Sequence, residues 1–476
     1  MRSLAFLAFN SLQYAAFLPV AVLVHWLLRS RKQRQLWLLA TSYVFYAWFD
    51  WRFLLLLIFT TCVDYAVGRQ LDSDRSDRAR RRLLAVSLSV NLAVLGFFKY
   101  AGFFVDQGMD LMRRFGFESA SPSLRILLPY GISFYTFQSM GYAIDVYRRK
   151  IEPSRSPIDF ATFVAFFPQL IAGPISRASA LLPQVEADRV RPSGRRVGSA
   201  LLLILTGLVK KVAIADPISQ VADTAFADPR PGTFLAIAGM VAFAVQIYAD
   251  FSGYTDIARG SARLFNIDLM HNFSQPYLSR SITEFWRRWH ISLSNWLRDY
   301  LYVPLGGNRG TAANTYRNLM LTMLLGGLWH GAAWTFIVWG GLHGVYLVFE
   351  RLTGLGQRAP VESNVNRTQA PRILMTFVLV CIAWVFFRAQ SFDQAIRVVL
   401  GVFDPGGTSI SPGLQMMVVV WSIAVVVIDL VSRRLVKPYD AALRRPLVSG
   451  VLIGLGVVVV VLFSGRPPVQ FIYFQF

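Results

Sequence analysis

Cysteine, histidine and acidic residues are scarce in this 476-residue chain, which has 2 cysteines, 5 histidines and 27 aspartates and glutamates. Cys62 and Cys381 both lie in apolar runs. They offer neither a disulfide framework nor the spacing of metal ligands, and we expect small buried side chains there. The sequence also lacks HExxH, GxSxG and phosphate-loop motifs, so it gives no support to a metal-dependent or an ATP-driven mechanism.

Positive charge is in excess, because 48 lysines and arginines give the chain a formal net charge of +21. Such an excess can mark a nucleic-acid-binding protein. Here the basic residues instead form short clusters between apolar runs, at Arg29–Arg34, Arg69–Arg82 and Arg148–Arg155. This pattern is typical of cytoplasmic loops that face anionic lipid headgroups. We therefore expect a lipid bilayer, and no nucleic acid, as the partner of these residues, with the N-terminus on the opposite side.

Long apolar runs are abundant, and 54% of all residues are hydrophobic. Because one membrane span needs about 20 apolar residues, the sequence predicts an all-α, polytopic transmembrane helical bundle of roughly 11 spans. We expect a single membrane domain over residues 1–476, and a first apolar run that is a retained span rather than a signal peptide. The candidate spans are 4–28, 35–49, 53–68, 83–105, 124–147, 197–214, 233–252, 316–349, 372–388, 414–431 and 447–464.

Two apolar stretches do not fit a straight helix. Residues 158–175 contain Pro168, Gly173 and Pro174, which favours a re-entrant segment whose polar backbone groups are satisfied by surrounding protein. Residues 319–349 contain six glycines. They indicate a kinked helix, or two half-helices packed closely against their neighbours.

The segment 259–317 is predicted to be cytoplasmic or interfacial and helical. Ser281 followed by Glu284 forms a capping box, which predicts a helix start. Apolar and aromatic residues then recur at three- and four-residue steps from Ile282 to Tyr300, with Arg287 and Arg288 among the residues on the other side. This pattern favours one amphipathic helix in the membrane interface.

Among the histidines, His330 is the strongest candidate for chemistry. No charged residue lies between Arg317 and Glu350, so burial should keep the imidazole neutral and able to take a proton from a hydroxyl that attacks a thioester. A packing histidine, hydrogen-bonded between helices, is the alternative. His290 could reach a cavity from the interfacial helix, or bond to lipid or backbone. We expect a structural role for His343, 13 residues after His330.

Two further groups of residues leave their roles open. Six of the twelve tryptophans lie between Trp286 and Trp339, where they could line a tunnel for an acyl chain or form an aromatic belt. Asp145, Asp250 and Asp256 lie near the ends of predicted spans, where they could pair with arginine or line a pore.

Several long motifs resemble a known family. The run 281–307, SITEFWRRWHISLSNWLRDYLYVPLGG, is similar to the signature of the membrane-bound O-acyltransferase (MBOAT) superfamily, and most similar to its bacterial alginate O-acetylase branch. Shorter matching runs lie at 128–138, 167–174, 248–258, 326–331 and 471–476. Asn266 departs from the pattern, which has glycine there.

The resemblance implies a helical bundle with a cytoplasmic funnel that leads to His330 as the catalytic histidine, with His290 as the second functional histidine. It implies acetyl-CoA or another acyl thioester as the donor, with no permanently bound cofactor and no metal. The expected partners are periplasmic O-acetylation proteins and, indirectly, a polysaccharide acceptor. The expected setting is multi-pass in the bacterial inner membrane, with alginate as the first candidate acceptor. Cellulose, peptidoglycan and teichoic acid are alternative acceptors, and a polymer transporter is an alternative function.

Overall fold

The computed structural model describes residues 7–72, 75–116, 126–355, 367–434, 446–464 and 469–474. Within these ranges the chain is helical and has no β-strand beyond one isolated bridge between Pro231 and Thr408. The predicted all-α class is confirmed. The chain forms two compact units, Met1–Arg196 with Ser261–Met270 and Val197–Gly260 with His271–Phe476. The single membrane domain stays a prediction.

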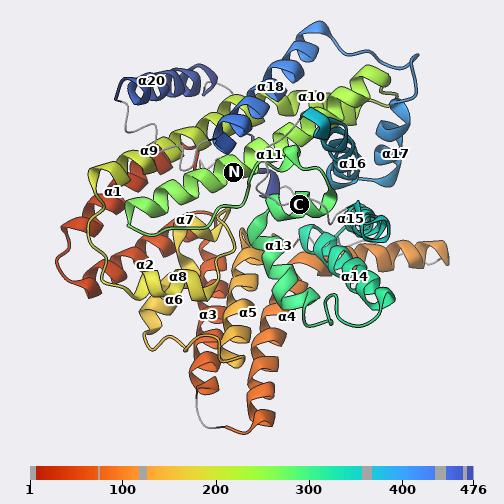
Figure 1. Cartoon of the computed structure of the whole chain (residues 1–476). Helices are drawn as coiled ribbons and strands as arrows, with labels where there is room; N and C mark the ends of the chain where they lie inside the picture. The colour runs from red at the N-terminus through yellow and green to blue at the C-terminus, as the bar shows by residue number, and fades with distance from the viewer. Residues whose placement is uncertain are drawn as a thin grey trace. The chain divides into compact units, whose positions relative to one another are not determined.

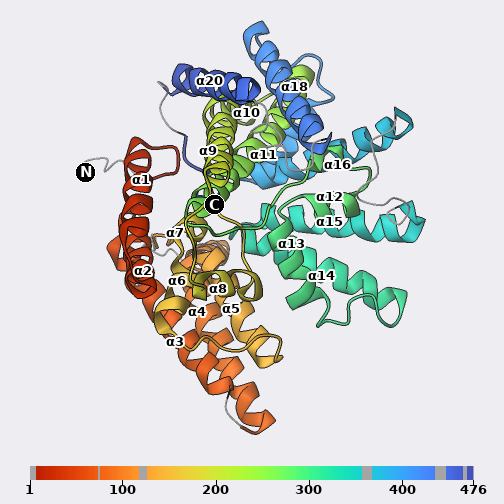
Figure 2. The same cartoon turned by 60° about the vertical axis from the view of Figure 1, so that its left-hand side comes forward.

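The first unit is built from the N-terminal helices, of which α3, α4 and α5 run side by side (Figures 1 and 2). A buried carboxylate joins two of them, because Asp64 accepts hydrogen bonds from Ser87 Oγ at 2.6 Å and from Asn91 Nδ2 at 3.0 Å. Such polar contacts join apolar helices where water is excluded. The helices are α1 (Leu12–Leu27), α2 (Arg31–Ala47), α3 (Trp51–Leu71), α4 (Asp77–Arg114), α5 (Ile132–Tyr147), α6 (Pro157–Ala165), α7 (Phe167–Leu170) and α8 (Ala178–Glu186).

The second unit holds the remaining helices and both candidate histidines. Its longest element is α11 (Thr233–Leu264), whose last residues, from Ser261, belong to the first unit. Helix α9 (Gly194–Leu208) begins in the first unit and continues in the second from Val197. The other α-helices are α10 (Asp216–Ala227), α12 (Ile282–Arg288), α13 (Ile291–Leu297), α14 (Ala312–His330), α15 (Trp334–Thr353), α16 (Ala370–Arg388), α17 (Phe392–Gly401), α18 (Pro412–Arg434) and α20 (Pro446–Phe463). The shorter turns are η1 (Val209–Ala215), η2 (Pro276–Leu278), η3 (Arg298–Tyr302), η5 (Arg367–Gln369) and η6 (Ile472–Phe474).

Six helical segments of the described chain are long and apolar enough to cross a membrane. They are Trp51–Leu71, Asp77–Arg114, Gly194–Ala227, Thr233–Leu264, Ala370–Arg388 and Pro412–Leu430. Each coincides with a predicted span, and the shorter apolar helices Leu12–Leu27 and Ser449–Phe463 coincide with the first and last. The chain is a multi-pass membrane protein, whereas the figure of roughly 11 spans stays a prediction.

The two irregular stretches are interrupted where their glycines and prolines predict. The segment 158–175 is not one helix, because α6 ends before Phe166 and the four-residue α7 begins at Phe167. The segment 319–349 divides into α14 and α15, which pack side by side (Figure 1). A Cβ on Gly327 would lie 2.2 Å from the carbonyl oxygen of Phe336, and one on Gly340 would lie 2.3 Å from that of Met323. Glycine is therefore required for this close packing.

Asn266 stands at a position where the resemblance led us to expect glycine, and its backbone conformation accounts for that expectation. Its φ angle is +60°, in the left-handed region that glycine enters freely and asparagine tolerates better than most residues. The N–H of Asn266 donates to the carbonyl of Arg263, and the N–H of Ile267 donates to that of Ala262. This is the Schellman arrangement that ends a helix, so asparagine preserves the end of α11.

Candidate functional site

The segment around His290 is two short helices rather than the single amphipathic helix expected. The predicted start is confirmed, because Ser281 Oγ accepts a hydrogen bond from the Glu284 N–H at 3.0 Å. However, α12 ends at Arg288, and α13 begins only at Ile291. His290 lies in the break with φ +41° and ψ 54°. A non-glycine residue in this left-handed region is uncommon and requires support from its surroundings.

Asn272 supplies that support directly. Its backbone carbonyl accepts from the N–H of Ile291 at 2.9 Å, and its side-chain oxygen accepts from the N–H of Ser292 at 3.2 Å. These two bonds satisfy donors at the start of α13 that have no partner within the helix. The break at His290 is therefore fixed by a neighbouring loop, which a helical period in the sequence cannot indicate.

The start of α12 is fixed in turn by a carboxylate from α15. Glu350 accepts hydrogen bonds from the backbone N–H groups of Ile282 and Thr283 and from the Thr283 hydroxyl. A carboxylate at a helix N-terminus is favourable because the exposed N–H groups carry partial positive charge. Glu350 thereby holds α12 against α15.

Arg288 was expected on the polar side of an interfacial helix, and this expectation is wrong. Its side chain is buried, and its guanidinium lies 2.8 Å from the Glu284 carboxylate, which also binds Arg280 at 2.9 Å. The pairs with Glu284 offset the cost of burying the guanidinium groups. The three residues hold α12 together on the side where the sequence predicts solvent.

His290 is fully buried among aromatic rings. Its imidazole centroid lies 4.7 Å from that of Phe251 and 6.1 Å from that of Trp329. Burial lowers the pKa of His290 from 6.5 to about 3, because a charged imidazolium loses its hydration in such surroundings. The ring is therefore neutral at physiological pH. Its burial excludes the alternative of a histidine bonded to lipid.

His330 is the last residue of α14, where the backbone becomes extended at Gly331 before α15 begins. Its side chain is buried, with 5% of the residue's surface exposed. Its ring lies 4.9 Å from Trp329, 4.9 Å from Trp339 and 5.1 Å from Phe387, measured between centroids. Its place at a helix end leaves the imidazole beside the extended backbone of Gly331, which packs against the ring of Phe336.

The ring of Tyr473 lies close to both histidine rings. Its ring centroid lies 5.6 Å from that of His330 and 6.3 Å from that of His290. Sequence reasoning gave Tyr473 no role, although the run 471–476 was among the motifs carrying the resemblance. The sequence could have indicated a role for Tyr473, because this tyrosine lies in a motif that resembles the family although it is far along the chain from both histidines.

A buried charge cluster in the same unit anchors the segment that carries Tyr473. Lys211 Nζ lies 2.7 Å from Asp216 and 2.9 Å from Asp250, and it also donates to the carbonyl of Val469 at 2.9 Å. The second oxygen of Asp250 accepts from the N–H of Ile472 at 2.7 Å. Of the two alternatives left open for Asp250, pairing with arginine or lining a pore, the structure shows an ion pair, but with lysine as the partner. Asp256 pairs with Lys210 at 2.7 Å and with Arg259 at 3.4 Å.

His343 lies on the neighbouring helix α15, separated from His330 by the ring of Trp339. Its Nδ1 accepts a hydrogen bond from Trp286 Nε1 at 3.3 Å, an arrangement suited to the structural role expected for it. Trp289, Trp329 and Trp339 are buried, so these three do not form an aromatic belt, whereas Trp334 is exposed.

The site therefore combines two buried imidazoles with the ring of a tyrosine, in a helical chain with segments able to cross a membrane. A neutral imidazole can accept a proton from a hydroxyl during acyl transfer. These features suit a membrane-bound transferase.

Comparison with known proteins identifies the family. The profile of MBOAT, the membrane-bound O-acyltransferase family, matches residues 40–391. The chain belongs to this family and is an O-acyltransferase. It is 46% identical over 402 residues to the probable alginate O-acetylase AlgI of Pseudomonas aeruginosa, covering 83% of this chain and 74% of the relative.

Two further relatives are similar to this chain over most of its length. A probable alginate O-acetylase AlgI of Azotobacter vinelandii is 45% identical over 396 residues, covering 83% of this chain and 77% of that protein. A peptidoglycan O-acetyltransferase of Helicobacter pylori is 37% identical over 425 residues, covering 83% of this chain and 79% of that protein.

Proposed function

We propose that this O-acyltransferase takes an acetyl group from a cytoplasmic thioester, such as acetyl-CoA, and passes it across the inner membrane for O-acetylation of an exopolysaccharide. Alginate is the proposed acceptor, because the relatives named as alginate O-acetylases are more similar to this chain than the peptidoglycan enzyme is. The grouping of His330, His290 and Tyr473 carries the proposal. Periplasmic O-acetylation proteins are the proposed partners that deliver the group to the polymer.

His330 is proposed as the general base. Its imidazole takes the proton of an attacking hydroxyl as the oxygen forms a bond to the thioester carbonyl carbon. When the tetrahedral intermediate collapses, the carbon–sulfur bond breaks and the proton passes to the departing thiolate. The acetyl group then stands on oxygen and the thiol is released, so the reaction needs no other reactant.

His290 and Tyr473 are proposed to complete the site. Both flank the region next to His330, and a neutral imidazole or a tyrosine hydroxyl can hold or exchange a proton there. Their fixed positions matter, because catalytic groups act efficiently only when held in the reacting geometry.

The test uses the full-length chain in an alginate-producing bacterium from which its own acetylase gene has been deleted, with polymer-bound acetate as the readout. The wild-type chain is expected to restore acetylation. His330→Gln is expected to lower it by about 10²- to 10⁴-fold, the usual contribution of general acid–base catalysis. His343→Gln is the matched control, because it makes the same change on the adjacent helix and its amide oxygen can still accept from Trp286.

Membrane levels of each variant are compared by immunoblot. Wild-type acetylation by His330→Gln, at an equal protein level, would remove the proposed mechanism. A wild-type chain that acetylates peptidoglycan but not alginate would instead change the acceptor and leave the reaction class intact.

A further inference from the structure

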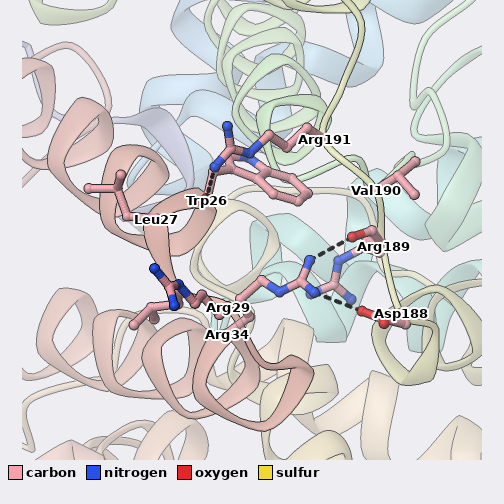
Figure 3. A pocket seen from close by; sticks show the side chains of 9 residues that line it. Trp26, Leu27, Arg29, Arg34, Asp188, Arg189, Val190 and Arg191 are labelled. Atoms are coloured by element: carbon pink, nitrogen blue, oxygen red, sulfur yellow. Dashed lines mark hydrogen bonds and ion pairs between the residues drawn. The ribbon is translucent and has the colours of Figure 1, made fainter.

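A basic pocket of about 430 Å³ lies in the first unit, where α1 ends and α2 begins (Figure 3). Four of its lining residues are arginines and one is an aspartate, so the lining carries a formal charge of +3. The proposed acyl transfer assigns no role to the residues that line this pocket. The lining residues are Trp26, Leu27, Leu28, Arg29, Arg34, Asp188, Arg189, Val190 and Arg191.

Two of the arginines are held in place by the protein itself. Arg34 donates to Asp188 at 2.9 Å and to the carbonyl of Arg189 at 2.7 Å, and its guanidinium lies 5.9 Å from the centre of the Trp26 ring. Arg191 donates to the carbonyl of Trp26, and both sets of bonds are visible in Figure 3. The pocket is therefore preorganised, which lowers the entropic cost of binding a ligand.

The positive charge in this region is only partly balanced. Helix α2 has no acidic residue in its first turn and begins with Arg31 and Lys32, although a helix N-terminus itself favours negative charge. Arg31 is balanced by Asp159 at 2.7 Å, outside the pocket lining. Arg189 is only 9% exposed, and its hydrogen bonds go to neutral oxygens of Gln184, Val185 and Gln35.

Burial and repulsion between these like charges lower the pKa of Arg189. Burial, and then the charges of Arg31 and Arg34, lower its pKa from 12.5 to about 10, against the opposite effect of Asp159 and Asp188. A bound anion would relieve this repulsion and complete the pairing of the arginines.

The surroundings of the pocket indicate the kind of anion. Two apolar lining residues, Leu27 and Val190, are 64% and 73% exposed. The pocket lies at the end of the apolar helix α1, beside Trp26, a residue type that favours the boundary between membrane and water. Basic residues in such a position attract anionic lipid headgroups. We infer that this pocket binds the phosphate of an anionic phospholipid, with Leu27 and Val190 beside the upper part of its acyl chains.

The experiment measures lipid retention by the full-length protein in detergent, using native mass spectrometry with added phosphatidylglycerol. Arg29→Gln with Arg191→Gln removes two charges from the pocket and is expected to weaken retention by about tenfold or more. Arg81→Gln with Arg82→Gln is the matched control, because these exposed arginines of α4 lie outside the pocket. The control is expected to retain lipid as the wild type does.

A second variant should strengthen binding and does not depend on weakening the fold. Asp188 has a side chain that is 66% exposed, so Asp188→Asn should fold normally. Its amide oxygen can still accept the hydrogen bond from Arg34, while the pocket's formal charge rises. We expect tighter retention of phosphatidylglycerol. Equal retention by all variants would overturn the inference. So would equal retention of zwitterionic phosphatidylcholine, or displacement of the lipid by inorganic phosphate at the same concentration, which would indicate a site for soluble phosphate.

Discussion

Replacing Lys211 by methionine should release the C-terminal segment that places Tyr473 beside His330. Lys211 is 1% exposed and lies between the carboxylates of Asp216 and Asp250. The substitution keeps a long apolar side chain and removes the ammonium group together with its hydrogen bond to Val469. Two buried carboxylates then face each other without a cation between them.

The expected cost follows from that geometry. Removing one partner of a buried ion pair typically destabilises a protein by about 3–5 kcal/mol, because a charge remains buried without compensation. A typical domain is stable by about 5–15 kcal/mol, so Lys211→Met should lower the unfolding temperature markedly. Local release is expected first at residues 469–472, because Val469 loses its partner and Ile472 is bonded to the repelled carboxylate.

The assay combines hydrogen exchange of the C-terminal segment with acetyl transfer by the purified full-length protein. Lys211→Met should exchange faster at Ile472 and should lose transfer activity. A triple variant, Lys211→Met with Asp216→Asn and Asp250→Asn, removes all three charges. It should regain much of the stability, since replacing a buried ionic group by neutral residues is often tolerated. Its activity should stay low, because the anchor at Val469 is still missing.

Two outcomes would refute this reasoning. Unchanged exchange at Ile472 in Lys211→Met would mean that the cluster does not anchor the C-terminal segment. Faster exchange with wild-type activity would mean that the position of Tyr473 does not matter for the reaction.

Two further predictions concern the site itself. Tyr473→Phe keeps the ring and removes the hydroxyl, so the unfolding temperature should change little. Because the hydroxyl is proposed to hold or exchange a proton, the rate of acetyl transfer should fall by about 10²-fold or more. A rate equal to that of the wild type would exclude this role. His290 should make the fold acid-sensitive: its folded pKa of about 3 lies below 6.5, so the unfolded chain binds the additional proton. This contribution to stability is complete above pH 6.5 and falls by about 1.4 kcal/mol per unit as the pH decreases toward 3. Unfolding temperatures from pH 7.5 to 5 should therefore decline more steeply for the wild type than for His290→Gln, and parallel curves would contradict the prediction.

The helical architecture could be predicted from the sequence. Apolar runs of about 20 residues are long enough to cross a membrane as helices, and this length and composition can be read without the tertiary structure. The predicted spans fall on helical segments, although 316–349 is divided between α14 and α15. The break at Phe166 lies two residues before Pro168, as a local effect of proline predicts. His330 was likewise a candidate from the sequence, since a histidine within a long uncharged stretch is costly to retain without a purpose, and its catalytic role stays a prediction.

Other features depended on contacts between residues distant in the chain. The helix break at His290 is stabilised by Asn272, and α12 is held by Glu350. The apolar spacing from Ile282 onward predicted one continuous helix, because hydrophobic periodicity reports which face is buried and not which backbone groups a neighbour will cap. The burial of Arg288 was missed for a different reason. Its partner Glu284 lies one turn away on the same helix, but the apolar spacing placed Arg288 on the polar face and did not show that protein covers that face.

Tyr473 is the clearest case of a residue that only the tertiary structure could place. It lies 143 positions after His330, and no local pattern connects the two. Its position results from the buried cluster of Lys211, Asp216 and Asp250, which binds the segment before it. Helical propensity and apolar periodicity depend on neighbouring residues, so they can be read from the sequence. The buried ion cluster brings together residues that are distant in the chain, and their electrostatic interaction becomes strong only when folding removes them from water.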